Sequence, residues 1–255
     1  MVRMKYDEFQ SYIRKMSKLC DKAKEEFISI LQKQADYSGI LVNLDRDTII
    51  EVANAVSLKY GEGTAALACQ MYDDMADLSG KRIPPAIPAE AMSYNEVGKV
   101  INGALKSQND EILTSSVGRI VKQRGQDTTL QNAKRDGAQC AWIPSGDTCA
   151  FCITLASRGW EKPKDGHADH IHANCDCVYA VRFNNSTNYQ GYDPDYYRDL
   201  YDNTDYGAKS SKDKINAMRR KFYKENKDEI NAQKRSAYAK RKELNSSLAE
   251  EINID

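Results

Sequence analysis

The chain has 255 residues, 37 of them basic and 37 acidic, and its formal net charge of zero excludes both a polycation and a strongly acidic protein. Hydrophobic residues make up 41% of the chain and the mean hydropathy is -0.69, which is typical of long solvated helices. No apolar run approaches the roughly 18 residues that cross a membrane, and the N-terminus lacks the apolar core of a signal peptide. We therefore expect no membrane partner and a protein made in a cytoplasm, where its seven cysteines stay reduced.

Helical periodicity dominates the first third of the chain. Apolar residues recur every three or four positions over 6–37, which predicts one long amphipathic helix. Asp45 or Asp47 can cap a second helix that ends at Gly61, because acidic side chains accept the free backbone N–H groups of a first helical turn. An Ala-rich third helix is expected over 64–78.

The next stretch, Gly80–Pro88, holds three of the six prolines and cannot continue a helix. We interpret it as an extended linker or an arm that lies on a neighbour. A further helical run begins at Ser93 with a break near 107–110, and Asp127 can cap a short helix that reaches about Ala138.

The helical pattern stops at Trp142. Beyond it, the alternation over Val178–Phe183 predicts a short strand, and the Tyr/Asp-rich stretch 189–206 is expected to be more loop than helix. These changes divide the chain into an N-terminal helical region, a Pro-rich linker or arm, a Cys/His-containing region, and a tail that begins Tyr/Asp-rich. The four regions are 1–80, 81–92, 93–183 and 184–255.

Four of the seven cysteines and all three histidines lie between Thr148 and Cys177. Tetrahedral Zn²⁺ takes two ligands from one tight turn and two from a second, so two closely spaced Cys/His groups predict zinc as a cofactor. The candidate metal ligands are Cys149, Cys152, His172, Cys175 and Cys177.

The favoured ligand set is the first cysteine pair, His172, and one of Cys175 or Cys177. His172 and Cys175 repeat the two-residue gap of the first pair, so a second tight turn can present both. Two histidines keep an open role, His167 and His170. Three cysteines stand apart on helical patterns and are expected to be small buried hydrophobes, Cys20, Cys69 and Cys140.

A structural zinc is the preferred interpretation, because this segment is too poor in apolar residues to build its own core. A zinc deaminase needs a His-x-Glu before its cysteine pair, and no histidine precedes Cys149. A thioredoxin-like pair should open a helix after a strand, whereas 144–147 has the composition of a turn. An HNH-like nuclease stays as the alternative because Asp169–Ile171 is similar to its first strand, although no histidine follows His172.

Lysine and arginine dominate the segment Asp205–Glu243, with 13 Lys/Arg against 6 Asp/Glu. A solvated charged helix would explain the pattern, and so would non-specific contact with DNA phosphates, which Lys and Arg neutralise. The candidate nucleic-acid-binding residues are Arg219, Arg220, Lys221, Lys234 and Arg235. The sequence thus predicts a mainly α fold of long amphipathic helices, with a small α+β zinc-stapled segment and a basic helical tail.

A series of short motifs runs through the centre of the chain: Asp127–Thr128, Asn132–Gly137, Trp142–Pro144, Thr148–Cys152, Leu155–Gly159 and His172–Cys177. Together they resemble the C-terminal half of the phage Mu F-like minor head (minor capsid) proteins, over about 117–183. Those proteins typically close on His-Pro-Asn-Cys-Arg-Cys. The ligand positions are kept here, while Ala173 and Asp176 replace the proline and the arginine.

The resemblance implies a virion protein present in few copies, placed in the capsid interior near the portal vertex after synthesis in the host cytoplasm. It implies a role in head morphogenesis, DNA packaging or ejection, with the portal protein and the major capsid or scaffolding protein as partners. We therefore expect a structural minor capsid protein without enzymatic activity. The alternatives are a zinc-containing phage nuclease of the head or packaging apparatus, and a zinc-stapled DNA-binding protein unrelated to virions.

Overall fold

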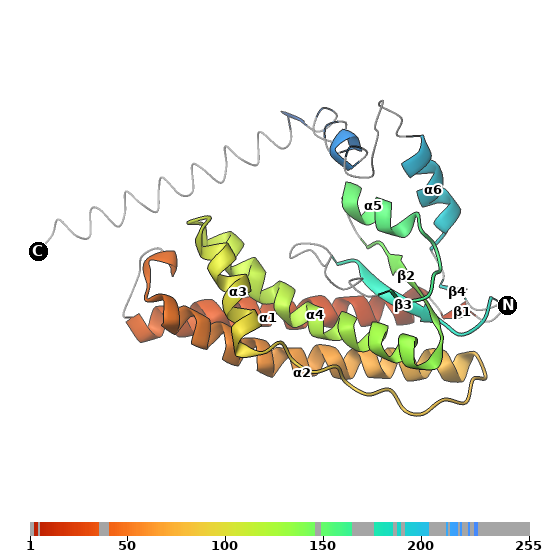
Figure 1. Cartoon of the computed structure of the whole chain (residues 1–255), viewed down its shortest axis with the longest axis horizontal. Helices are drawn as coiled ribbons and strands as arrows, with labels where there is room; N and C mark the ends of the chain where they lie inside the picture. The colour runs from red at the N-terminus through yellow and green to blue at the C-terminus, as the bar shows by residue number, and fades with distance from the viewer. Residues whose placement is uncertain are drawn as a thin grey trace, which may run out of the picture. The chain divides into compact units, whose positions relative to one another are not determined.

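The computed structural model describes residues 3–4, 6–35, 41–145, 149–164, 176–185, 188–189, 192–203 and separate positions between 213 and 228. The chain divides into two units, Met1–Asp199 and Leu200–Asp255, which we describe separately. The described chain is mainly helical, as the sequence predicts (Figure 1).

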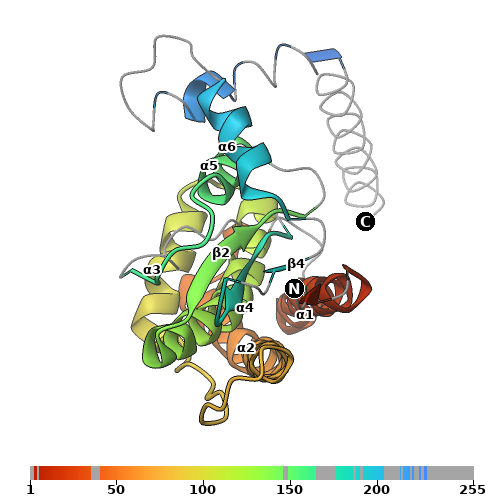
Figure 2. The ribbon, with the colours of Figure 1, turned by 90° about the vertical axis from the view of Figure 1, so that its right-hand side faces the viewer.

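The body of the first unit is built from helices whose bounds are α1 Tyr6–Ala35, η1 Leu41–Asn43 (a short 3-10 helix), α2 Arg46–Leu78, α3 Tyr94–Leu105 and α4 Asp110–Asp136. The long helices α1, α2 and α4 each pack against the other two, and α3 lies against α2 and α4 (Figures 1 and 2). No helix in the described part of the chain combines the length and the apolar character that crossing a membrane would require.

Local signals predicted several helix ends correctly. The helix expected over 6–37 is confirmed as α1, and Asp45 rather than Asp47 caps α2, accepting a backbone N–H of the first turn at 2.9 Å. Ser93 caps α3 in a reciprocal capping box, and the break expected at 107–110 separates α3 from α4.

The predicted end of the second helix at Gly61 is wrong, because α2 continues through Gly61 and Gly63. Neighbouring helices pack closely on both glycines. A Cβ atom would lie 3.1 Å from Arg124 of α4 at Gly61 and 3.0 Å from Leu19 of α1 at Gly63. Packing between helices thus outweighs the roughly 1 kcal/mol that a helical glycine costs relative to alanine.

The short helix predicted to begin at Asp127 is also wrong, since α4 runs without interruption from its cap Asn109 to Gly137. Asp127 lies inside α4, where its carboxylate accepts the Gln123 amide at 2.9 Å. Gly137 ends the helix with a left-handed φ of 65°. Many buried side chains of α4 are polar, so the apolar periodicity that marks α1 is lost here.

A small sheet and two short helices follow α4. Their bounds are β2 Gln139–Ile143, α5 Ala150–Ala156, β3 Val178–Arg182 and α6 Pro194–Asp202. β2 pairs antiparallel with β3, with Ile143 opposite Val178, and α5 packs on β2. A second, parallel pair joins the strands β1 Arg3–Met4 and β4 Asn188–Tyr189.

The strand predicted over 178–183 is confirmed as β3. The helical pattern ends at Asp136 rather than at Trp142, which lies inside β2. The loop expected over 189–206 is corrected by α6, which exposes most of its side chains.

Buried residues form two core clusters at opposite ends of the long helices. One cluster combines the first half of α1, the last turns of α2 and α4, and the β2–α5–β3 region. The other combines the second half of α1 with the first halves of α2 and α4 and with α3. The described residues of the cysteine region therefore share a core with the helices.

Candidate functional site

The first predicted ligand pair opens helix α5. Cys149 is the N-cap residue and is exposed, and its side chain makes no capping hydrogen bond. Cys152 lies one turn later and is fully buried. One helical turn therefore carries both thiols at a spacing that can supply two metal ligands. The pair opens a helix that follows strand β2 in the chain, so the ground on which a thioredoxin-like pair was set aside does not hold.

Cys177 immediately precedes β3 and is fully buried in the same core cluster as Cys152. Burial raises the pKa of Tyr179 in β3, and the neighbouring Cys140 raises it further; Tyr179 belongs to the same core cluster as Cys152. Trp142 of β2 packs edge-on against Tyr179 with ring centroids 4.8 Å apart. The β2–α5–β3 arrangement thus brings two of the predicted ligand positions, Cys152 and Cys177, to one apolar core.

The rest of the predicted ligand set cannot be placed. His172, Cys175, His167 and His170 lie outside the described residues. Among the residues that the structure does describe, no three His, Cys, Asp or Glu side chains gather as a metal site would require. The zinc site therefore stays a prediction that rests on thiol chemistry and spacing.

The remaining cysteines behave largely as predicted. Cys140 is 1% exposed, and burial raises the pKa of its thiol. Cys20 is 7% exposed, and burial raises its pKa to about 11. Cys69 is only half-buried. Cys20 and Cys140 are therefore confirmed as buried apolar residues, with thiols that stay protonated at neutral pH.

One of the five predicted nucleic-acid-binding residues is described. Arg220 is exposed and helical, whereas Arg219, Lys221, Lys234 and Arg235 lie outside the described residues.

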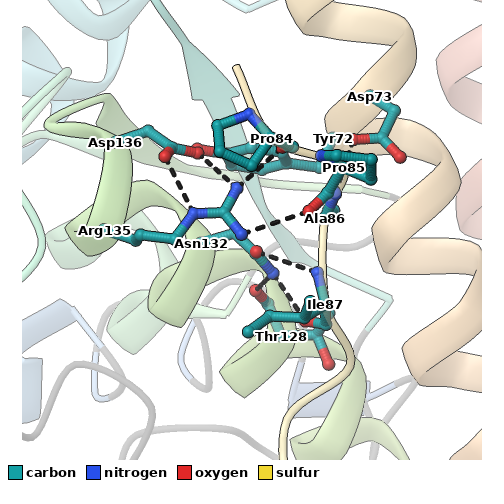
Figure 3. Close-up of polar contacts among 10 residues, drawn as sticks. All are labelled: Tyr72, Asp73, Pro84, Pro85, Ala86, Ile87, Thr128, Asn132, Arg135 and Asp136. Carbon is teal, nitrogen blue, oxygen red and sulfur yellow. Dashed lines mark hydrogen bonds and ion pairs between the residues drawn. The ribbon is translucent and has the colours of Figure 1, made fainter.

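The Pro-rich linker 81–92, here called the strap, is extended as predicted, but it lies on helices of its own chain (Figure 3). Asn132 of α4 holds Ile87 from both sides of its peptide: the amide oxygen accepts the Ile87 N–H at 3.0 Å, and the amide nitrogen donates to the Ile87 carbonyl at 2.8 Å. Asp73 of α2 accepts the Ala86 N–H at 2.9 Å. Side chains of α2 and α4 thus form the hydrogen bonds with the strap backbone that a neighbouring strand would form in a sheet.

Three more side chains of α4 continue these contacts along one face of the helix. Thr128 accepts the N–H of Ala89 at 3.0 Å, and Arg124 donates to the Ala89 carbonyl at 3.1 Å. The Arg135 guanidinium donates to two strap carbonyls, those of Pro84 and Pro85, at 3.0 and 3.1 Å. Positions 124, 128, 132 and 135 recur at helical spacing, so one face of α4 contacts the strap between Pro84 and Ala89.

An ion pair lies at the C-terminal end of this face of α4. Arg135 pairs with Asp136 at 2.7 Å, and the Asp136 carboxylate accepts the Tyr72 hydroxyl of α2 at 2.9 Å (Figure 3). The Arg135 guanidinium, helped by the Tyr72 hydroxyl, holds the pKa of Asp136 below its usual range. Asp136 therefore stays ionised at neutral pH and links α2 to α4 where the strap begins.

No strap-binding residue was predicted. The only signal in the sequence is a row of polar residues at helical spacing in α4, together with a Pro-rich stretch earlier in the chain. The residues that form these hydrogen bonds lie up to 51 positions apart in the sequence. These contacts hold a segment in place through hydrogen bonds, and they bury Asn132 completely.

The fold and the cysteine region define a helical protein with a small sheet that rests on its long helices. A family model described as "VG15 protein" matches residues 2–204. The chain belongs to this family, which is a family of viral (phage) proteins. Neither the curated proteins nor the solved structures give a match. The matched residues include the helices, the strap and the β2–α5–β3 region and end just before the basic segment.

Replacing Asn132 by alanine should destabilise the protein by about 1–3 kcal/mol, because it removes a fully buried amide together with its hydrogen bonds to the Ile87 N–H and carbonyl. Urea unfolding measures the change, and hydrogen exchange at Ile87 should become faster. Asn102→Ala is the matched control: it removes an exposed hydrogen bond from Arg46 and should cost less than about 0.5 kcal/mol. Equal losses in the two variants would contradict the role assigned to Asn132.

Proposed function

We propose that this chain is a phage minor capsid and head-morphogenesis protein, a structural component near the portal inside the procapsid. Its membership of a viral protein family over residues 2–204 carries the proposal. The resemblance of 117–183 to Mu F-like minor head proteins supports the finer assignment. The portal protein and the major capsid or scaffolding protein are the proposed partners.

The positions of the resembling motifs favour a structural role over a catalytic one. Trp142–Pro144 ends β2, Cys149–Cys152 opens α5, and Cys177 leads into β3. Asn132–Gly137 closes α4 and includes two side chains that hold the strap. The described motif residues thus build elements and fix one segment to another, which suits a protein that docks on other subunits.

The assignment is tested on the phage that encodes the chain. Quantitative mass spectrometry of purified procapsids and virions should find the protein in both, at a few copies per major capsid shell, and cross-linking should join it to the portal protein. Absence from both particles would reject the assignment. The nuclease alternative is tested separately: Mg²⁺- or Mn²⁺-dependent plasmid nicking that is lost in His170→Ala would favour it.

We further propose that Cys149 and Cys152 hold Zn²⁺ together with His172 and one of Cys175 or Cys177. Zinc in such a site supplies no chemistry beyond holding its ligands together. Two thiols on one helical turn and a third position at the start of β3 fit this role, because they come from segments that the small sheet already joins.

Elemental analysis of protein purified under reducing conditions without chelator should give about one zinc per chain. Cys149→Ser/Cys152→Ser should reduce the ratio to near zero and lower the thermal unfolding temperature, because the metal contributes to folding. Cys69→Ser changes a half-buried cysteine outside the site and should keep the metal. A wild-type ratio near zero would reject the zinc site.

The basic segment is proposed to contact packaged DNA without sequence preference. Changing its candidate residues to glutamine should weaken binding to random-sequence duplex at least about tenfold at low salt, because fewer counterions are released. The changed residues are Arg219, Arg220, Lys221, Lys234 and Arg235. Fluorescence anisotropy across a salt series measures the effect. Lys81→Gln/Arg82→Gln on the exposed start of the strap is the control, and equal weakening in both variants would contradict the proposal.

A further inference from the structure

The strap has a burial pattern that repeats every three residues. Ile83 and Ala86 are half-buried and pack on a core cluster, and Ala89 is buried. Every other position from 81 to 90 is exposed. A β-strand alternates every two residues, whereas a polyproline II helix has three residues per turn and therefore three edges. The strap thus follows the polyproline II period and turns one edge toward the body of its own chain.

The amino-acid sequence of the strap favours this conformation. Proline fixes its own φ at about −65°, and it restricts the residue before it to extended or polyproline II backbone. Pro84, Pro85 and Pro88 therefore constrain every residue from 83 to 88 except Ala86. The hydrogen bond from the Ala86 N–H to Asp73 of α2 holds this remaining position. The strap is consequently ordered before any partner binds.

The two outward edges of the strap carry the residues of a polyproline II ligand. Arg82, Pro85 and Pro88 share one exposed edge at intervals of three residues, and Pro84 and Ile87 share the other. Ile87 is 51% exposed, although it is a large apolar residue. Together the edges present two apolar pairs, Pro84–Pro85 and Ile87–Pro88, after a positive charge. Segments with the spacing Pro-x-x-Pro dock into clefts lined by aromatic rings, such as the cleft of an SH3 domain.

The contacts within the chain leave these two edges available. A partner that holds two edges of a three-edged helix leaves the third edge facing away, and here that edge carries Ile83 and Ala86, which the chain itself covers. Three strap carbonyls already accept hydrogen bonds from Asn132 and Arg135 of α4 (Figure 3). A partner therefore recognises the outward side chains, and the strap can be held by its own helices and by the partner at the same time.

We propose that the strap is a docking segment for a second protein, whose cleft is lined by aromatic side chains and carries an acidic group at one end. Each apolar pair of the strap, Pro84–Pro85 and Ile87–Pro88, fills one pocket of the cleft, and Arg82 pairs with the acidic group. Because the fold already holds the strap in the bound shape, little conformational entropy is lost on binding. This inference goes beyond the assignment to a phage head and does not depend on it.

The probe is a purified, fluorescently labelled SH3 domain that selects Arg-x-x-Pro-x-x-Pro ligands. Fluorescence anisotropy measures its binding to the full-length protein and to a synthetic peptide of residues 80–91. We expect a dissociation constant on the order of micromolar for the protein. The protein should bind at least about threefold more tightly than the peptide, because the peptide must still be ordered when it binds.

Two single substitutions in the full-length protein test the two kinds of contact. Ile87→Ser removes an apolar residue of one pair and Arg82→Glu reverses the charge, and each should weaken binding of the probe at least about tenfold. The matched controls are Ile112→Ser on α4, where the isoleucine is 44% exposed, and Arg14→Glu on α1. Both controls should bind like the wild type. All four positions are exposed, so every variant should fold, which circular dichroism and urea unfolding verify.

Three outcomes would each overturn the proposal. The first is a probe that binds neither the protein nor the peptide, since the strap would then lack the chemistry of a polyproline II ligand. The second is a protein that binds no more tightly than the peptide, since the fold would then not present the strap in the bound shape. The third is a loss of binding that is no greater in the two strap variants than in their matched controls.

Discussion

Polar side chains of helix α4 form hydrogen bonds with backbone groups of two other segments, the strand β3 and the strap. Gln126 is fully buried, and its amide oxygen accepts the N–H of Tyr179 in β3 at 2.7 Å. Asn132 does the same for both polar groups of Ile87 in the strap. An unpartnered backbone group in a buried position costs about 1–3 kcal/mol, which applies directly to the buried Tyr179 N–H, while the fully buried Asn132 side chain fixes the more exposed strap.

The contact between α4 and α2 depends on equally specific packing. A Cβ atom on Gly125 would lie 3.0 Å from the Thr64 carbonyl oxygen, so only glycine lets the two helices approach this closely. The Thr64 hydroxyl donates to the Val121 carbonyl of α4 at 2.7 Å, a hydrogen bond that also requires the two helices to lie this close together. Gly61, which the sequence indicated as a helix end, and Gly63 likewise lie where side chains of a neighbouring helix approach the backbone of α2.

This explains what could be predicted from the sequence. The amphipathic pattern of α1, the caps Asp45 and Ser93 and the alternation of β3 are local signals, and all of them are confirmed. The continuity of α2 was missed because its glycines pack against side chains of α4 and α1 that are distant in sequence, and that of α4 because many of its buried side chains are polar. The Cys149–Cys152 pair could be proposed from spacing, whereas the strap-binding role of Asn132 needed the fold.

The strap and the cysteine region present the same physical problem with different solutions. Both are segments with few apolar residues that must lie on a helical body, and the strap is held by side chains of α2 and α4. The chain after α5 has less support among the described residues, where two backbone hydrogen bonds between Cys140 and Glu161, at 2.8 and 3.0 Å, join it to β2. A metal bound at the start of α5 and at Cys177 before β3, as we propose, would add a further link between these elements, which is the role of a structural zinc.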